Sequence, residues 1–135
     1  MKKLVLSSLE YTVVAFVLAM LWHVVLFKKY YVSTGMLEEP KPLFGLASII
    51  IQALILPALY SAYHKGVRPA AEGLGFGLLL AALLGSFGVV EAASRYDLGP
   101  LPRWFAYEGS FFVALYVLTG LAFGMIFGRP RRAAG

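Results

Sequence analysis

Residues 71–93 read AEGLGFGLLLAALLGSFGVVEAA, and this stretch decides the fold. Its only ionisable side chains are Glu72 and Glu91, one near each end. An α-helix rises ~1.5 Å per residue, so the stretch is long enough to cross a hydrocarbon core of ~30 Å. Apolar residues occupy every side of such a helix, which leaves no polar face for water. The pattern therefore predicts a transmembrane helix.

Three more stretches of the same character lie outward along the chain, at residues 4–27, 43–63 and 104–127. The segments between them are rich in glycine, proline and charged residues, which a hydrocarbon region excludes. They include Glu38 and Pro40 before the second helix, and Pro130 follows the fourth. The sequence thus predicts an all-α fold, an integral membrane bundle of four transmembrane helices in a single domain over residues 1–135.

The composition supports a membrane protein and excludes several other classes. Of the 135 residues, 60% are hydrophobic and 14% charged, whereas about 25% are charged in an average soluble domain. The net charge is +5, but the basic residues stand at segment ends, beside lipid headgroups. We therefore expect membrane lipid as a partner and no nucleic acid. The absence of cysteine excludes disulfides and thiolate chemistry.

The distribution of basic residues favours an orientation with both termini in the cytoplasm of a bacterium. Seven basic residues then lie inside and five outside, among the 12 in the chain. The inner residues are Lys2, Lys3, Lys65, Arg68, Arg129, Arg131 and Arg132, and the outer ones are Lys28, Lys29, Lys41, Arg95 and Arg103. An even number of spans places the two ends on one side. The predicted location is the bacterial inner membrane.

Glycines recur at three- and four-residue spacing in the third and fourth predicted helices, which places them along one side of each. Helices in a bilayer associate through close packing, because lipid tails are as apolar as leucine. The glycine stripes therefore predict helix packing, within one chain or between copies in a homo-oligomer. They comprise Gly73, Gly77, Gly85, Gly88, Gly120, Gly124 and Gly128.

Ionisable groups in apolar segments are costly, so each calls for a partner or a water-lined position. Near the inner boundary, we expect Glu10 and Glu72 to reach the headgroups or to pair with lysine or arginine. In the outer half, His23, Glu91 and Glu108 share one depth, and an α-helical extrapolation from Gly88 turns Glu91 toward protein. We expect these three around one polar interior. The further candidate ligand-binding residues are Trp22, Gln52 and Tyr116.

The residue pattern leaves alternatives open for this outer group. Glu91 with Arg95, and Glu108 with Arg103, can form plain ion pairs at the membrane boundary. The ligand types also suit a metal, but one histidine and no spacing signature do not predict a metal site. Phosphate-binding loops and hydrolase motifs are missing, and no cofactor is indicated.

Several positions resemble a group of small bacterial four-helix membrane proteins to which no activity is assigned. They are Trp22-His23, Phe27-Lys28, Tyr30, Gln52, Trp104-Phe105 and Glu108. The resemblance implies the fold and carries no activity with it.

The expected function is that of a small multi-pass membrane protein that binds or transports a small ligand or ion through a polar interior near the outer leaflet. One alternative is an accessory subunit of a larger membrane complex. The other is a membrane enzyme that acts on a lipid or quinone headgroup, although the missing catalytic motifs make an enzyme the less favoured interpretation.

Overall fold

The computed structural model describes residues 1–35, 39 and 41–128, and this part of the chain holds helices and loops but no strand. Six segments are α-helical and two, η1 and η2, are π-helical, with i→i+5 hydrogen bonds. In order they are α1 (Lys2–Ala19), η1 (Met20–Leu26), α2 (Lys28–Ser33), α3 (Pro42–Tyr63), α4 (Pro69–Gly85), η2 (Ser86–Glu91), α5 (Ala92–Arg95) and α6 (Leu101–Gly128).

Four continuous helical spans are long and apolar enough to cross a membrane, which confirms the predicted number and the all-α class. They are Lys2–Leu26, Pro42–Tyr63, Pro69–Arg95 and Leu101–Gly128. The last three begin one to three residues before their predicted starts, because proline stands in the first turn, where its missing amide costs nothing. The predicted loop and tail residues Glu38, Pro40, Arg129, Pro130, Arg131 and Arg132 lie outside the described residues.

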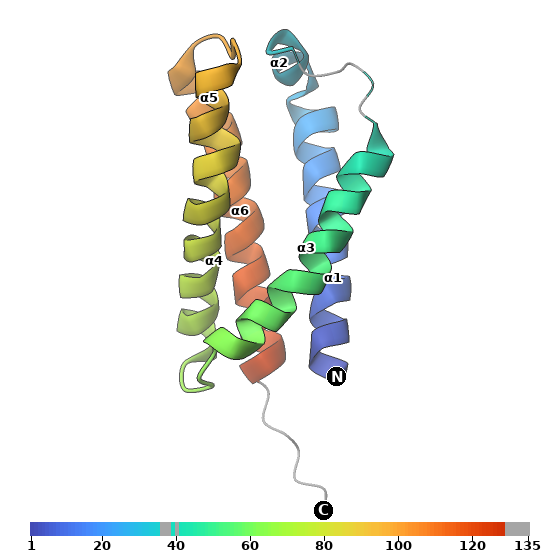
Figure 1. The fold of residues 1–135 in the computed structure, drawn as a ribbon, viewed down its shortest axis with the longest axis vertical. Coiled ribbons are helices and arrows are strands. Elements are labelled where there is room, and N and C mark those ends of the chain that lie inside the picture. Colours follow the sequence, from blue (N-terminus) through green and yellow to red (C-terminus); the bar gives the residue numbers. More distant parts are fainter. Residues whose placement is uncertain (36–38, 40, 129–135) are drawn as a thin grey trace, which may run out of the picture.

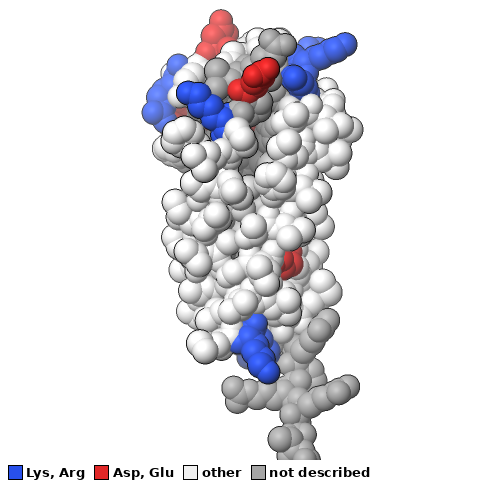
Figure 2. Space-filling view, turned by 90° about the vertical axis from the view of Figure 1, so that its right-hand side faces the viewer, with Lys and Arg blue, Asp and Glu red and all other residues white. Residues whose placement is uncertain are grey.

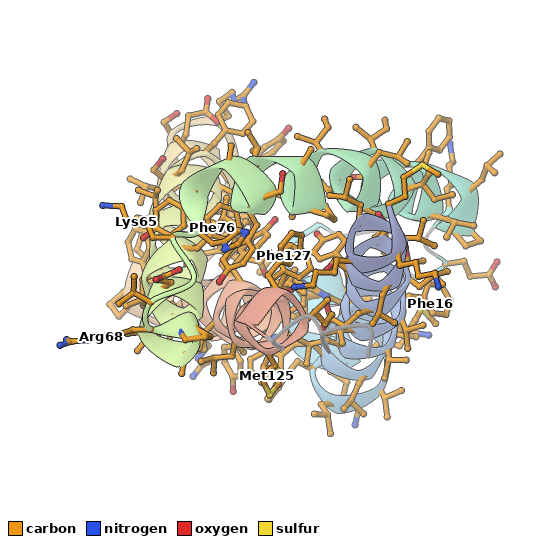
Figure 3. The ribbon with its side chains drawn as sticks, turned by 90° about the horizontal axis from the view of Figure 1, so that it is seen from below. Phe16, Lys65, Arg68, Phe76, Met125 and Phe127 are labelled. Atoms are coloured by element: carbon orange, nitrogen blue, oxygen red, sulfur yellow. The ribbon has the colours of Figure 1, made fainter. Side chains whose placement is uncertain are left out.

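The helices form a row with one helix across it (Figure 1, Figure 3). The row is α1, α6 and α4, and α3 crosses one side obliquely. Met1, the α3–α4 loop and Gly128 lie at one end, here called the terminal end, whereas α2 and α5 lie at the other, the loop end. Figure 2 shows Lys and Arg gathered at both ends of one face, with an almost wholly uncharged surface between them.

Glycines allow α4 and α6 to pack backbone against backbone. A Cβ atom at Gly73 would overlap the carbonyl oxygen of Gly120, and one at Gly77 would overlap that of Tyr116. Further along, Gly124 lies against the Pro69 carbonyl, which extends the contact toward the terminal end. Any side chain at these positions would force the two backbones apart.

The remaining stripe glycines face side chains instead of backbone. Gly128 lies against the Pro69 ring, and Gly88 against the ring of Phe112. Gly85 is at ordinary contact distance from Phe112, 3.7 Å for an added Cβ. The two backbones are therefore in contact over the half nearer the terminal end, whereas toward the loop end the Phe112 side chain lies between the helices.

An aromatic core joins α3 to this helix pair at the terminal end. Tyr60 and Phe123 are 1% and 0% exposed, and their ring centroids lie 5.7 Å apart. Phe76 and Phe127 complete the group, at 5.0 and 5.3 Å from the Tyr60 ring. Figure 3 shows both phenylalanines between the helices, whereas Phe16 points away from the bundle.

Two charged side chains satisfy backbone groups at the terminal end. The Glu72 carboxylate accepts hydrogen bonds from the four consecutive amides of residues 65–68, at 2.8 to 3.0 Å. The Lys3 amine donates to the Phe127 carbonyl at 2.6 Å, in the last turn of α6, where carbonyls lack helical partners. Of the two expected arrangements for Glu72, pairing with a lysine or arginine side chain is replaced by these bonds to the backbone amides of the turn before α4.

Candidate functional site

Three polar side chains from separate elements meet near the loop end. His23 comes from η1, Tyr31 from α2 and Glu108 from α6. The His23 Nε2 atom lies 3.2 Å from Oε2 of Glu108, and the Tyr31 hydroxyl donates to the same oxygen at 2.6 Å. We call these three residues the His23 cluster.

Aromatic rings shield the His23 cluster from solvent. The side chains of His23 and Glu108 are 15% and 12% exposed, and Tyr31 is fully buried. The His23 ring lies 4.4 Å from the Tyr31 ring and 4.5 Å from the Phe111 ring, centroid to centroid. Charges in such surroundings interact more strongly than in water, because the effective dielectric constant is lower.

The hydrogen-bond partners of His23 define which of its ring nitrogens carry a hydrogen. The Nδ1 atom lies 3.1 Å from the Ala19 carbonyl oxygen, which can only accept, so Nδ1 carries a hydrogen. On the other side, an ionised carboxylate also only accepts. A hydrogen bond between Nε2 and Glu108 therefore requires a proton between them, as imidazolium with carboxylate or as neutral imidazole with carboxylic acid. The pair holds one exchangeable proton.

Tyr31 stays a neutral donor to this pair. Burial raises the pKa of its hydroxyl above the ordinary value, and the hydrogen bond to Glu108 and the charge of that carboxyl raise it further. Loss of the tyrosine proton would place two anions together. The Tyr31 hydroxyl thus remains protonated while the His23–Glu108 pair exchanges its proton.

Glu91 does not join the His23 cluster. Its carboxylate accepts a hydrogen bond at 2.6 Å from Arg95, one turn on, and both side chains are exposed. The α-helical extrapolation from Gly88 fails because residues 86–91 form the π-helix η2, whose wider turns rotate later side chains away from their α positions. Val89 faces the interior instead, at 5% exposure. The expected convergence of His23, Glu91 and Glu108 is thus wrong for Glu91.

Gln52 and Tyr116 form a second polar group with Tyr11, which joins α1, α3 and α6. The Tyr11 and Tyr116 hydroxyls both donate to Oε1 of Gln52, at 2.8 and 2.7 Å. The Gln52 amide donates to the Ser48 hydroxyl at 3.3 Å. We call these four residues the Gln52 cluster. Tyr116 follows Glu108 by eight residues, about 12 Å along α6 toward the terminal end, so the two clusters are separate.

Trp22 packs against aromatic rings beside the His23 cluster, and the described residues form no ion pair between Glu108 and Arg103. The Trp22 ring lies 5.0 Å from Phe27 and 6.2 Å from Phe111, and its Nε1 atom is buried without a hydrogen-bond partner among the described residues. The ring contacts of Trp22 place it beside Phe111, which also packs on His23. The boundary ion pair of Glu108 with Arg103 is replaced by the bonds to His23 and Tyr31.

A further carboxyl lies on α1, toward the terminal end. In the described part of the chain, Oε2 of Glu10 and the hydroxyl of Ser7 are buried and have no hydrogen-bond partner. Ser7 is 0% exposed, and the two residues stand three apart, on one side of the helix. Seven residues before Glu10, on the same side, Lys3 reaches α6. Glu10 is therefore an ionisable group directed toward the helix interface.

Sequence reasoning overlooked Tyr11 and Tyr31 as site residues. A buried tyrosine nearly always bonds its hydroxyl, so Tyr11 within an apolar stretch signals a polar partner. Tyr31 carried no comparable signal, because tyrosines beside lysines are typical of membrane boundaries. Its role depends on the helix break at Phe27, where φ is −119° and ψ 19°.

Among the described residues, no group of three His, Cys, Asp or Glu side chains lies close enough together to hold a metal ion. The set of His23, Glu91 and Glu108 is not assembled, since Glu91 faces elsewhere. What the site offers chemically is the proton held between His23 and Glu108. Comparison with known proteins finds no matching family model, no matching curated protein and no matching solved structure.

Proposed function

We propose that this chain is a multi-pass protein of the bacterial inner membrane, with both termini cytoplasmic, that binds and transports a small ion. The ion that the site fits best is the proton, exchanged at the His23–Glu108 pair near the outer leaflet. The observation that most supports this proposal is the 3.2 Å contact between His23 Nε2 and Glu108 Oε2, which requires a shared proton. Ionisable residues are rare within apolar spans and often belong to proton relays.

Loss of the proton would change the packing of the site. A lone pair on Nε2 and a carboxylate would then face one another at the same position, and both are acceptors. The two groups would separate, which moves η1 relative to α6. Protonation is thereby coupled to the contact between two helices, as transport requires.

Glu10 supplies a second ionisable position on the way to the terminal end. It stands 13 residues before His23, about 20 Å along the helix, and its Oε2 atom is buried without a partner among the described residues. The Gln52 cluster includes Tyr11, which directly follows Glu10 on α1, and it contributes hydroxyl groups that both donate and accept. Polar groups at these two depths of the first span support transport rather than binding alone.

Proteoliposomes that contain a pH-sensitive dye test this proposal directly. A potassium gradient with valinomycin drives proton uptake, and the parent chain should exceed empty vesicles. Glu108→Gln should reduce uptake to the empty-vesicle rate, and Glu10→Gln should reduce it strongly. Glu91→Gln is the matched control, because Glu91 is exposed and paired with Arg95. Equal rates for the parent and empty vesicles, or equal losses in Glu91→Gln and Glu108→Gln, would refute proton transport.

Imidazole NMR tests the site itself. The chain has two histidines, so a His64→Gln background leaves His23 alone. We expect nitrogen shifts that report a hydrogen on Nδ1 and a strong hydrogen bond at Nε2, with the second signal lost in Glu108→Gln. A His23 spectrum that ignores Glu108→Gln would show that the pair is not formed.

A second candidate function is that of an accessory subunit, which the exposed first half of α3 favours. Over residues 42–51 every residue except Ile49 is exposed, and a Cβ added at Gly45 would meet nothing within 4 Å. Leu43 and Phe44 are 73% and 72% exposed. Native mass spectrometry of the gently extracted protein decides the matter, since a subunit would retain a partner of fixed mass.

A further inference from the structure

A hollow of about 500 Å³ opens at the loop end, where the first span bends. It is lined by the consecutive residues Val24–Tyr30 and by Tyr107 of α6. The hollow exists because η1 ends at Phe27, whose backbone leaves the helical region, and α2 then starts in a new direction. It is distinct from the His23 cluster, whose three side chains do not line it.

The lining of this hollow divides into an apolar and a cationic part. Val25 and Leu26 are 67% and 56% exposed and continue the apolar surface of the first span. Lys28 and Lys29 follow at once and are both exposed. The hollow therefore has an apolar wall on the side of the span and two ammonium groups next to it. This order of apolar and cationic groups matches the acyl chain and phosphate of a phospholipid.

Aromatic rings form the inner wall. The Tyr107 ring lies 4.6 Å from the Phe27 ring and 4.6 Å from the Tyr30 ring. Tyrosine at such a boundary presents an apolar ring and a polar tip. The wall is therefore stiff, and its shape does not depend on long flexible side chains.

Among the described residues, the Tyr30 hydroxyl is an unpartnered polar group in the wall of this hollow. Its oxygen is buried and has no hydrogen-bond partner in the described part of the chain. Burial raises the pKa of this hydroxyl, the positive charge of Arg103 lowers it, and Glu108 and Tyr107 raise it further. A neutral donor close to Arg103, Lys28 and Lys29 is suited to an anionic oxygen, because hydrogen bonds to charged acceptors are the strong ones.

We propose that this hollow binds one anionic phospholipid. Its phosphate is held by Lys28, Lys29 and the Tyr30 hydroxyl, and an acyl chain lies along Val25 and Leu26. The charge complementarity selects an anionic headgroup over a zwitterionic one, and the apolar wall selects a lipid over a free phosphate. The proposal does not depend on proton transport, since none of these residues holds the proton at His23.

Native mass spectrometry of the full chain in mild detergent tests this site. The protein is mixed with phosphatidylglycerol and phosphatidylcholine of the same acyl chains, in equal amounts. The parent should retain the anionic lipid at least about fivefold over the zwitterionic one, the factor that one basic residue is worth beside an anionic surface. Equal retention of the two lipids would overturn the proposal.

Variants locate the binding. Lys28→Gln with Lys29→Gln should abolish the preference, and Tyr30→Phe, which keeps the ring, should lower the retention of phosphatidylglycerol several-fold. The matched control is Lys65→Gln with Arg68→Gln, which removes the same charge at the terminal end and should leave the preference intact. An equal loss in the control would mean that net charge, and not this hollow, attracts the lipid.

A competition arm separates the headgroup from the whole lipid. Glycerol phosphate, which lacks acyl chains, should fail to displace phosphatidylglycerol at the same concentration. Displacement would overturn the role of Val25 and Leu26. Circular dichroism of each variant checks that its helices are intact, and unchanged retention in a folded Tyr30→Phe would remove the hydroxyl from the site.

Discussion

Gly120→Ala is the sharpest test of how α4 and α6 pack. The added Cβ would overlap the Gly73 carbonyl oxygen and lie 2.8 Å from the Gly77 nitrogen and 2.9 Å from its Cα. All three atoms belong to backbone, which no rotamer change can move. Carbon atoms prefer separations of about 3.5 to 4.0 Å, so the two helices must part by roughly half an ångström or more. Overpacking of this kind costs about 1–3 kcal/mol.

Gly109→Ala provides the matched control on the same helix. An added Cβ there meets nothing within 4 Å. Both substitutions gain the helix propensity of alanine over glycine, about 1 kcal/mol, so the difference between the variants isolates the steric cost. We expect Gly120→Ala to be less stable than Gly109→Ala by about 1–3 kcal/mol.

The assay is reversible unfolding in mixed detergent and dodecyl sulfate micelles, followed by helicity. A second substitution, Gly73→Ala, should cost less in the Gly120→Ala background than alone, because the helices are already apart. That coupling should exceed about 0.5 kcal/mol, the size seen for residues in contact. If Gly120→Ala and Gly109→Ala unfold together, the backbones do not meet at Gly120 and the account of this interface is wrong.

Four further predictions follow from other parts of the fold. Reporters inserted after Gly66 and fused to the C terminus should both report cytoplasm and one after Gly35 the outside, so labelling of Gly66 from outside would contradict the orientation. Glu91→Gln and Glu108→Gln should be additive in unfolding free energy to within about 0.5 kcal/mol, since the two carboxyls have separate partners, and larger coupling would place them in one site. Glu72→Gln should lower the melting temperature, because a neutral amide replaces the carboxylate that accepts four backbone amides, and an unchanged melting temperature would show that these bonds do not stabilise the turn. Glu108→Gln should lower the pKa of Tyr31, measured by ultraviolet titration against a Tyr31→Phe blank, because it removes a charge that disfavours the tyrosinate.

The four spans could be predicted because the signal is local. Each span is a continuous apolar stretch, and the length that a bilayer requires does not depend on neighbouring helices. The glycine spacing of Gly73, Gly77, Gly120 and Gly124 also lies within single helices, so one side of each could be assigned from sequence. Which helix faces which stripe is a tertiary question, and the pairing of Gly73 with Gly120 was visible only in the structure.

The candidate site could be predicted only in part, because the positions of its side chains depend on helical turns that depart from α geometry. His23 and Glu108 could be proposed together from their shared depth alone. Glu91 satisfied the same criterion, yet the π turn at residues 86–91 directs it to Arg95. Tyr31 could not be found, since it follows a bend at Phe27 that no residue type marks. The depth of a residue along a helix can be predicted from the sequence. The direction of its side chain around the helix axis can be predicted only where the α-helical period continues.

The two π-helical segments and the candidate site lie at the same end of the molecule for a physical reason. A π turn inserts an extra residue into a helix and commonly occurs at functional positions. Here η1 carries His23. Its last backbone hydrogen bond runs from the Phe27 amide to the Trp22 carbonyl, just before the bend that places Tyr31 beside the histidine. Without that extra residue, the His23 side chain and the segment after the bend would both be rotated relative to α6. The bonds of His23 and Tyr31 to Glu108 would then be lost. The irregular turn is thus what directs an imidazole and a phenol from one span to a single carboxyl of another, and the same bend opens the hollow beside Lys28.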